Sequence, residues 1–168
     1  MIPSIRIAPA IFVAALLSAA CSRPDFSQSD KAAPTSALSV PDVPGWARPL
    51  EGRNVATLGA PSGGCTGFVD AVIGRYEGPR RGVELAGWGW DAKAKRPFER
   101  VLVVDDGKIV GAGTSHIERP DVTAANPSIT APKTGWSAFV HEPAGNLAAY
   151  GVRRSGVCLI ARFELKPP

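Results

Sequence analysis

Frequent glycine and proline residues constrain the fold of this chain more than any other feature of its sequence. The 18 glycines and 16 prolines occupy about a fifth of the 168 positions, against roughly an eighth in average usage. Both residue types are favoured in turns, and proline interrupts helices. The sequence therefore argues against a helical bundle and predicts short strands joined by many turns.

Downstream of Trp46 the hydrophobic residues recur with a period of two, which is typical of strands. Residues 65–73 alternate in this way. Residues 100–104 form a continuous apolar run, as expected of a strand that is covered on both faces. The Asp106-Gly107 pair follows this run and predicts a hairpin, because glycine readily adopts the positive φ of a tight turn. Further strands are expected over residues 83–90, 108–112, 136–141, 146–154 and 156–165.

This pattern of six or seven short strands predicts an all-β fold. Turns recur about every 8–12 residues, which is typical of a sandwich of two antiparallel sheets. Residues 116–133 interrupt the strands with three prolines. One helical turn is expected there at Pro120–Ala125, because proline is preorganised for the first turn of a helix. We therefore expect a single antiparallel β-sandwich.

Residues 1–20 have the features of an export signal. Arg6 precedes an apolar stretch over residues 7–17, and small residues lie directly before Cys21. The apolar stretch is too short to span a hydrocarbon core of about 30 Å as a permanent helix. Signal peptidases also require small residues before the cleavage site. The sequence thus predicts that residues 1–20 are removed on export.

The junction from Leu17 to Cys21 resembles the lipobox of bacterial lipoproteins. This resemblance implies that Cys21 receives a lipid and becomes the first residue of the mature protein. In the lipobox a leucine usually lies three places before the cysteine, but here Ser18 takes that place and Leu17 lies one position earlier. A lipid-anchored protein that faces the periplasm or the cell surface is therefore expected, and cleavage to a soluble secreted or periplasmic protein is the alternative.

Cysteine usage predicts one disulfide. Lipidation of Cys21 leaves Cys65 and Cys158 in a compartment that permits disulfides. A bond between them closes a loop of about 93 residues and stabilises the fold by ~4 kcal/mol through the chain entropy of the unfolded state. A redox-active cysteine is the alternative, but the sequence has no CxxC motif and no neighbouring cluster of activating charge.

The chain is expected to form one folded domain behind a tether. Residues 22–44 are rich in Ser, Ala, Asp and Pro and nearly devoid of aromatic side chains, so they bury too little surface to offset the entropy of ordering. The expected organisation is a signal peptide over residues 1–20, a lipid anchor and disordered linker over residues 21–45, and a β-sandwich domain over residues 46–168.

Motifs in this domain resemble an immunoglobulin-like accessory module of bacterial envelope proteins. They are GWGWD at residues 87–91, VLVVDDG at residues 101–107, RPDV at residues 119–122 and a GW pair at residues 135–136. In that module they correspond to a strand ending in aspartate, a hairpin, a turn and the start of another strand. The resemblance implies an immunoglobulin-like antiparallel β-sandwich without catalytic residues, and it carries over no ligand.

Two groups of residues are candidates for ligand binding. Trp88 and Trp90 share one strand face and would offer an aromatic platform to a sugar ring, whereas packing in the core or at its rim is the alternative. Glycines alternate with them and leave the other face bare for close approach by another element. Arg119 in the loop with Asp121 would clamp an anionic ligand. Alternatively, Asp121 accepts backbone N–H groups of its turn and Arg119 pairs with a carboxylate or carbonyl.

Catalytic, metal and nucleic-acid sites have few residues to draw on. The chain contains two His and three Cys, and it has no GxSxG, HExxH or CxxC motif. Ser115 and His116 are neighbours, so on a strand they point to opposite faces. Asp105 and Asp106 lack the spread of oxygen ligands that calcium requires. The net charge of +4 is too small and too scattered for nucleic-acid binding. We expect no catalytic residue, metal, cofactor or nucleic-acid partner.

These observations predict a non-enzymatic lipoprotein of the bacterial cell envelope that acts as a binding or assembly module. Its expected partners are the membrane, through the lipid on Cys21, and a glycan or another envelope protein. The alternative is a small envelope hydrolase or an enzyme inhibitor that uses Ser115 and His116 or the Arg119 loop.

Processing at Cys21 can be tested by mass spectrometry of the mature protein. We expect the mature chain to begin at Cys21, to carry the mass of a covalent lipid and to fractionate with membranes, because the lipobox-like junction directs lipidation. A Cys21→Ala variant should lose the lipid mass. A mature chain that retains residues 1–20, or that begins elsewhere with an unmodified thiol, would contradict the prediction.

Overall fold

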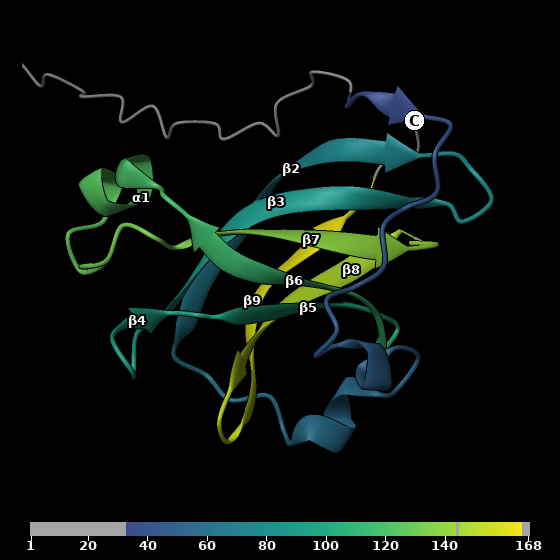
Figure 1. The fold of residues 1–168 in the computed structure, drawn as a ribbon. Coiled ribbons are helices and arrows are strands. Elements are labelled where there is room, and N and C mark those ends of the chain that lie inside the picture. Colours follow the sequence, from purple (N-terminus) through teal and green to yellow (C-terminus); the bar gives the residue numbers. More distant parts are fainter. Residues whose placement is uncertain (1–32, 144, 166–168) are drawn as a thin grey trace, which may run out of the picture.

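The computed structural model describes residues 33–143 and 145–165 (Figure 1). The predicted signal peptide, residues 1–20, and the predicted lipidation site at Cys21 lie outside these residues. The described part of the chain is all-β, as the sequence predicts. Its strands are β1 (Thr35–Ser36), β2 (Cys65–Tyr76), β3 (Gly82–Asp91), β4 (Arg96–Pro97), β5 (Arg100–Asp105), β6 (Lys108–Ile117), β7 (Gly135–His141), β8 (Asn146–Arg153) and β9 (Gly156–Glu164), and its helices are η1 (Arg48–Leu50), η2 (Val55–Leu58) and α1 (Pro120–Ala125).

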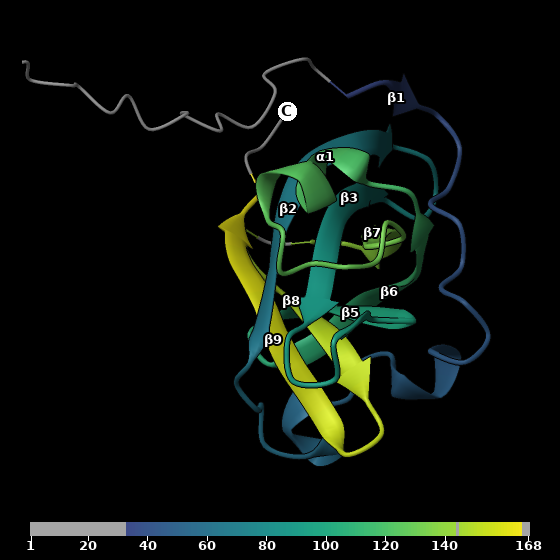
Figure 2. The same ribbon diagram turned by 90° about the vertical axis from the view of Figure 1, so that its left-hand side faces the viewer.

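The strands form one continuous sheet rather than two separate sheets. Its order is β1-β2-β3-β7-β6-β5-β8-β9, and β4 pairs with β3 outside this path. The pairings are antiparallel except that of β1 with β2, which is parallel. Figures 1 and 2 show that the sheet curls, so that β9 crosses behind β2. The predicted immunoglobulin-like sandwich is not confirmed, because a single curled, mixed sheet takes the place of two facing antiparallel sheets.

A disulfide joins β2 to β9, the first and last long strands of the sheet. The two strands contact each other without a hydrogen-bonded ladder between them. Cys65 on β2 and Cys158 on β9 form the bond, with their Cα atoms 6.1 Å apart. Beside it, Ile160 on β9 lies against Gly67 on β2, where a Cβ atom would collide with its side chain. The predicted disulfide is confirmed, and it fastens the two edges of the curl to each other.

The inner side of the curled sheet encloses the main hydrophobic core. Trp136 and Phe98 are its largest side chains, and they are 0% and 3% exposed. Each lies on a glycine: the Trp136 ring covers Gly87 on β3, and the Phe98 ring covers Gly151 on β8. The glycines of β3 thus permit the close approach that their alternation predicts. The other members of this core are Val69, Val83, Leu85, Val101, Val103, Ala138, Val140, Leu147, Ala149, Cys158 and Ile160.

A second core lies on the outer face of β5, β6, β8 and β9, beneath the segment that precedes β2. Val43, Ala47 and Val55 of that segment are buried against these strands. Upstream of them, Val40 is 0% exposed and its N–H donates to the carbonyl of Arg80 at 2.9 Å. The folded unit therefore begins before Trp46, and part of the predicted linker is ordered. Isolated valines in a polar segment are enough to cover the outer face, although the average composition of the segment is that of a tether.

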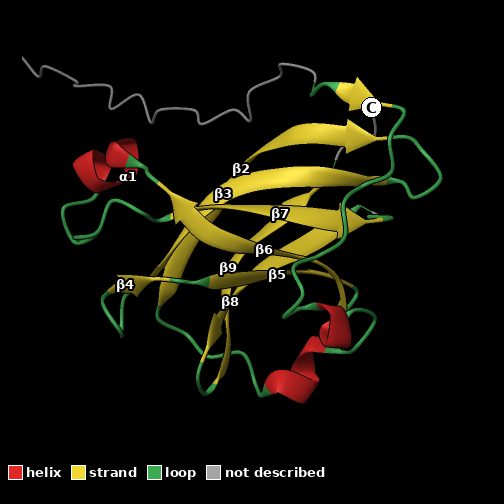
Figure 3. Cartoon of the chain, viewed as in Figure 1, coloured by secondary structure: helices red, strands yellow, loops and turns green. Residues whose placement is uncertain are grey.

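The predicted local features are confirmed where the residue type dictates backbone geometry. β5 and β6 form a hairpin, and its turn has φ of 42° at Asp106 and 79° at Gly107. The helical turn α1 begins at Pro120, as expected. Together with the loop that follows, α1 covers Trp90 in a small third core. Figures 2 and 3 show α1 at one end of the molecule.

A side chain at position 87 should destabilise the fold. A Cβ atom there would collide with the Trp136 ring and with the carbonyl of Phe68, and overpacking of a core costs about 2 kcal/mol. We expect Gly87→Ala to lower the free energy of unfolding by that amount in urea titrations. Gly45→Ala is the matched control, because a Cβ atom at Gly45 meets nothing within 4 Å. Equal stability of the two variants would show that Trp136 does not depend on the glycine.

Candidate functional site

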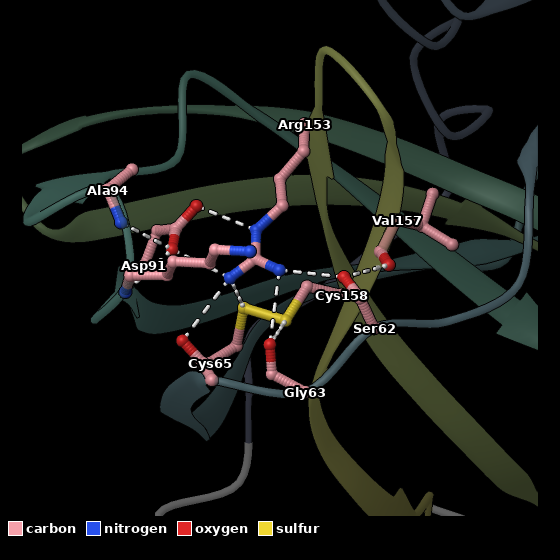
Figure 4. The surroundings of a disulfide bond; sticks show 10 residues. Ser62, Gly63, Cys65, Asp91, Ala94, Arg153, Val157 and Cys158 are labelled. Carbon is pink, nitrogen blue, oxygen red and sulfur yellow. Dashed lines mark hydrogen bonds and ion pairs between the residues drawn. A yellow bond between two sulfur atoms is a disulfide. The ribbon is translucent and has the colours of Figure 1, made fainter.

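The most highly connected polar side chain of the described residues is Arg153, which ends β8 (Figure 4). Its guanidinium forms a two-pronged ion pair with Asp91, the last residue of β3. Nε donates to Oδ2 at 2.7 Å, and Nη2 donates to Oδ1 at 2.6 Å. The two side chains are only 12% and 6% exposed. Paired charge-assisted hydrogen bonds of this kind fix both the distance and the plane of the two groups.

Asp91 also fixes the turn that follows β3. Its Oδ1 accepts hydrogen bonds from the backbone N–H groups of Lys93 at 3.1 Å and Ala94 at 3.0 Å. Burial raises the pKa of Asp91, but the hydrogen bonds from Arg153 and Ala94 outweigh this effect, so the pKa lies below its ordinary value of 3.8. Asp91 is therefore a charged, fully engaged carboxylate at neutral pH.

The remaining N–H groups of Arg153 hold the chain that leads into β2. Nη1 donates to Ser62 Oγ at 2.7 Å and to the carbonyl of Gly63 at 3.1 Å. Nη2 reaches the carbonyl of Gly64 at 3.3 Å and the sulfur of Cys65 at 3.0 Å. Arg153 thus joins β8, the end of β3 and the disulfide-bonded start of β2, as Figure 4 shows. We call this set, with Asp91 and residues 62–65, the Arg153 junction.

A small pocket opens beside the Arg153 junction, and we call it the arginine pocket. It has a volume of about 250 Å³ and lies between β4, the start of β5 and the turn from β8 to β9. Its apolar lining includes Phe98. Arg100 also lies over the ring of Trp46, with its guanidinium carbon 5.1 Å from the ring centroid. Its charged lining residues are Asp91, Arg96, Glu99, Arg100, Arg153 and Arg154.

A larger groove lies at the opposite ends of β5 and β8, and we call it the β8–β9 groove. Its volume is about 830 Å³. The turn from β5 to β6, the start of β8 and the end of β9 form its walls. Carboxylate, amide, phenol and guanidinium side chains line it together with apolar ones. The lining consists of Val104, Asp105, Asp106, Gly107, Asn146, Leu147, Ala148, Tyr150, Arg162, Phe163 and Glu164.

Trp90, which the sequence suggests as half of an aromatic platform, is buried. Its side chain is 2% exposed and packs against Val122 and Ile129 beneath α1. Trp88 packs against the same cluster and is partly buried. Because the ring of Trp90 has no open face, the predicted platform of two rings is corrected to a core contact that anchors α1 and its loop.

Arg119 and Asp121, the other predicted binding residues, form an ion-paired cluster with Asp70 on β2. Nε and Nη2 of Arg119 donate to the two carboxylate oxygens of Asp121 at 2.9 and 2.7 Å, and Nη1 donates to Asp70. The hydrogen bonds from Arg119 lower the pKa of Asp121, and the hydrogen bond to Asp121 raises that of Arg119. The guanidinium thus has a carboxylate on each side, which corresponds to the structural alternative and leaves no open anion clamp.

The two histidines have different partners. The ring nitrogens of His141 lie 3.1 Å from the carbonyl of Pro41 and 2.9 Å from the carboxylate of Glu51. His116 is exposed, and its Nδ1 lies 3.4 Å from the hydroxyl of Thr114. The hydroxyl of Ser115 is buried, without a hydrogen-bond partner among the described residues. Ser115 and His116 therefore point to different faces of β6.

Comparisons with known proteins give no match: no family model matches the chain, and no curated protein or solved structure is significantly similar to it. Within residues 33–143 and 145–165, no group of three or more His, Cys, Asp or Glu side chains could hold a metal ion. None of the helices in that same part of the chain is long and apolar enough to cross a membrane.

Loss of the Arg153 side chain should destabilise the protein. Arg153→Gln leaves the buried carboxylate of Asp91 without its cation, and breaking a buried ion pair in this way costs about 3 kcal/mol. Urea titration should show this loss at pH 7, whereas Arg154→Gln, a change at the neighbouring exposed position, should have little effect.

The same pair predicts a pH dependence. Because the pKa of Asp91 is lower in the folded protein than its ordinary value of 3.8, its contribution to stability is fully present above that value and is lost as the pH falls through the folded-state pKa. The stability difference between wild type and Arg153→Gln should therefore shrink below about pH 4. A difference that stays constant down to pH 2 would contradict the role given to the ion pair.

Proposed function

We propose that this chain is an exported, non-enzymatic binding module of the bacterial cell envelope that is anchored by a lipid on Cys21 and binds a glycan in the β8–β9 groove. The observation that carries the proposal is the composition of that groove. An open space of about 830 Å³ brings together carboxylate, amide, guanidinium and apolar side chains from three segments of the chain.

The polar side chains at the groove suit the hydroxyl groups of a sugar. Each sugar hydroxyl both donates and accepts, so a glycan site needs acceptors and donors close together. Asp106 and Glu164 supply carboxylate acceptors, Asn146 supplies both kinds of group, and Arg162 supplies donors. All four side chains are exposed. They can therefore reach a ligand that lies in the groove.

The base of the groove is formed by apolar side chains of a packed core. Val104, Ala148 and Tyr150 line it and belong to the second core, with exposures of 4%, 6% and 6%. A floor that is part of a packed core does not have to be ordered when a ligand binds, and preorganisation of this kind favours affinity. A largely preformed apolar surface with a few convergent polar groups is the usual form of a small-ligand site.

The anchoring part of the proposal rests on the sequence of the N-terminus. The lipobox-like junction at Cys21 and the polar segment that follows it fit a domain held at a membrane surface by a tether. A relation to the immunoglobulin-like envelope modules stays a prediction, supported by the shared GWGWD, VLVVDDG and RPDV motifs and by the all-β fold. The non-enzymatic assignment is supported by the contacts of His141 with Pro41 and Glu51, which leave it no nucleophile to activate.

Retention on immobilised glycans tests the groove. We expect the wild-type protein to be retained by peptidoglycan or by a glycan on an array, and Arg162→Ala and Asn146→Ala each to weaken binding about tenfold through the loss of hydrogen bonds to sugar hydroxyls. Arg154→Ala, at the other end of β8 and β9, is the matched control and should bind like wild type.

Two results would contradict the glycan assignment. One is the absence of retention on every glycan tested while cross-linking in cells captures another envelope protein at Arg162. The other is an unchanged affinity of Arg162→Ala and Asn146→Ala for a glycan that the wild type binds.

A further inference from the structure

We propose that the arginine pocket is a second binding site, for a ligand that carries a phosphate monoester group. This site is separate from the β8–β9 groove, because the two lie at opposite ends of β5 and β8. It shares only Asp91 and Arg153 with the Arg153 junction.

The pocket carries an excess of positive charge. Four arginines and two carboxylates line it, which leaves two net positive charges. Asp91 is engaged by Arg153 and by the turn after β3. Glu99 lies 3.9 Å from Arg96, and its side chain is 84% exposed, so this contact is weak.

Two of the arginines have no carboxylate partner. Among the described residues, neither Arg100 nor Arg154 forms an ion pair. Arg100 is instead placed over the ring of Trp46, with 5.1 Å between its guanidinium carbon and the ring centroid. These two side chains supply the uncompensated charge that an anion would meet.

Paired strands position the backbone around the pocket. Arg96 belongs to β4, which pairs with β3, and Arg100 begins β5, which pairs with β6 and β8. Arg154 directly follows Arg153, whose guanidinium is fixed by Asp91 and by residues 62–65. Phe98 lines the pocket and is 3% exposed because its ring packs on Gly151. The arginine backbones are thus positioned before any ligand arrives.

The charge and size of the pocket suit a phosphate monoester. A phosphate monoester carries a charge of about −1.5 to −2 at pH 7, with a second pKa near 6, which matches the two net positive charges. Its oxygens accept paired N–H donors from guanidinium groups, which bind phosphate and carboxylate in this forked geometry. A volume of about 250 Å³ admits the phosphate group and a few attached atoms. A carboxylate would compensate only half of the charge.

The contact between Arg100 and Trp46 supplies a spectroscopic signal for binding. An anion that draws the Arg100 guanidinium into the pocket changes the electrostatic field at the Trp46 indole, and with it the emission of that residue. The other tryptophans, Trp88, Trp90 and Trp136, lie in the cores on other faces of the sheet. A Trp46→Phe variant should therefore bind with the same heat but without the emission change.

Calorimetric titration with glycerol 3-phosphate at constant ionic strength tests the proposal. We expect saturable binding of one ligand per chain, together with a change in Trp46 emission. Exchange of both unpaired arginines, in Arg100→Gln/Arg154→Gln, should raise the Kd about tenfold or more. Arg162→Gln, in the β8–β9 groove, is the matched control and should leave the Kd unchanged. Binding should weaken as the pH falls below about 6, where the phosphate becomes a monoanion.

Two further measurements distinguish a soluble phosphate monoester from a lipid headgroup. Glycerol should not bind, and vesicles of phosphatidylglycerol, whose phosphodiester has a single charge, should not compete with glycerol 3-phosphate. Equal binding by wild type and the double arginine variant would overturn the proposal. So would vesicle binding that requires the same arginines in the absence of glycerol 3-phosphate binding. Glycan retention by the Arg162 variants reports on the other site, so failure of one proposal is distinguishable from failure of the other.

Discussion

The ion pair between Arg153 and Asp91 is the interaction on which one end of this fold depends. Burying two charges is costly, and the cost is offset only when further hydrogen bonds satisfy both groups. Here the carboxylate also accepts two backbone N–H groups, and the guanidinium also donates to residues 62–65. The Cys65–Cys158 disulfide joins β2 to β9, and Arg153 adds a side-chain link from β8 to Asp91 and residues 62–65, where Cys65 already pairs with Asp91 in the β2–β3 ladder. The disulfide and the ion pair therefore stabilise the same end of the sheet.

Much of the local structure could be predicted because single residue types dictate it. Asp106 and Gly107 adopt the positive φ of a tight turn, Pro120 begins a helical turn, and the two cysteines of the folded domain pair. The curl of the sheet was not predictable in the same way. A period of two tells which side chains share a face, but it does not tell which strands are neighbours. The pairing of β3 with β7 instead places the Trp136 ring over Gly87, a contact between positions far apart in the sequence.

The candidate sites could not be predicted from the sequence, because their residues are brought together only by the fold. Arg153 contacts Asp91, 62 positions earlier, and Ser62, 91 positions earlier, and no motif marks either pairing. Conversely, conspicuous motifs proved to have structural partners. Trp90 lies under α1, and Arg119 lies between the carboxylates of Asp70 and Asp121. In both cases a side chain that is large or charged enough to bind a ligand is also large or charged enough to fix a loop.

The Arg153 junction also determines what the neighbouring pocket can select. If Arg153 stood in the pocket without Asp91, three uncompensated charges would attract polyanions of many kinds, and a mobile guanidinium would adapt to their shapes. With Asp91 engaged on one edge of Arg153, the excess falls to two charges, which come from Arg100 and Arg154 at fixed points of the scaffold. A compact dianion gains from both at once, whereas a monoanion interacts with the same two charges about half as strongly. The buried pair therefore contributes selectivity to the pocket although its own groups are already satisfied by the protein.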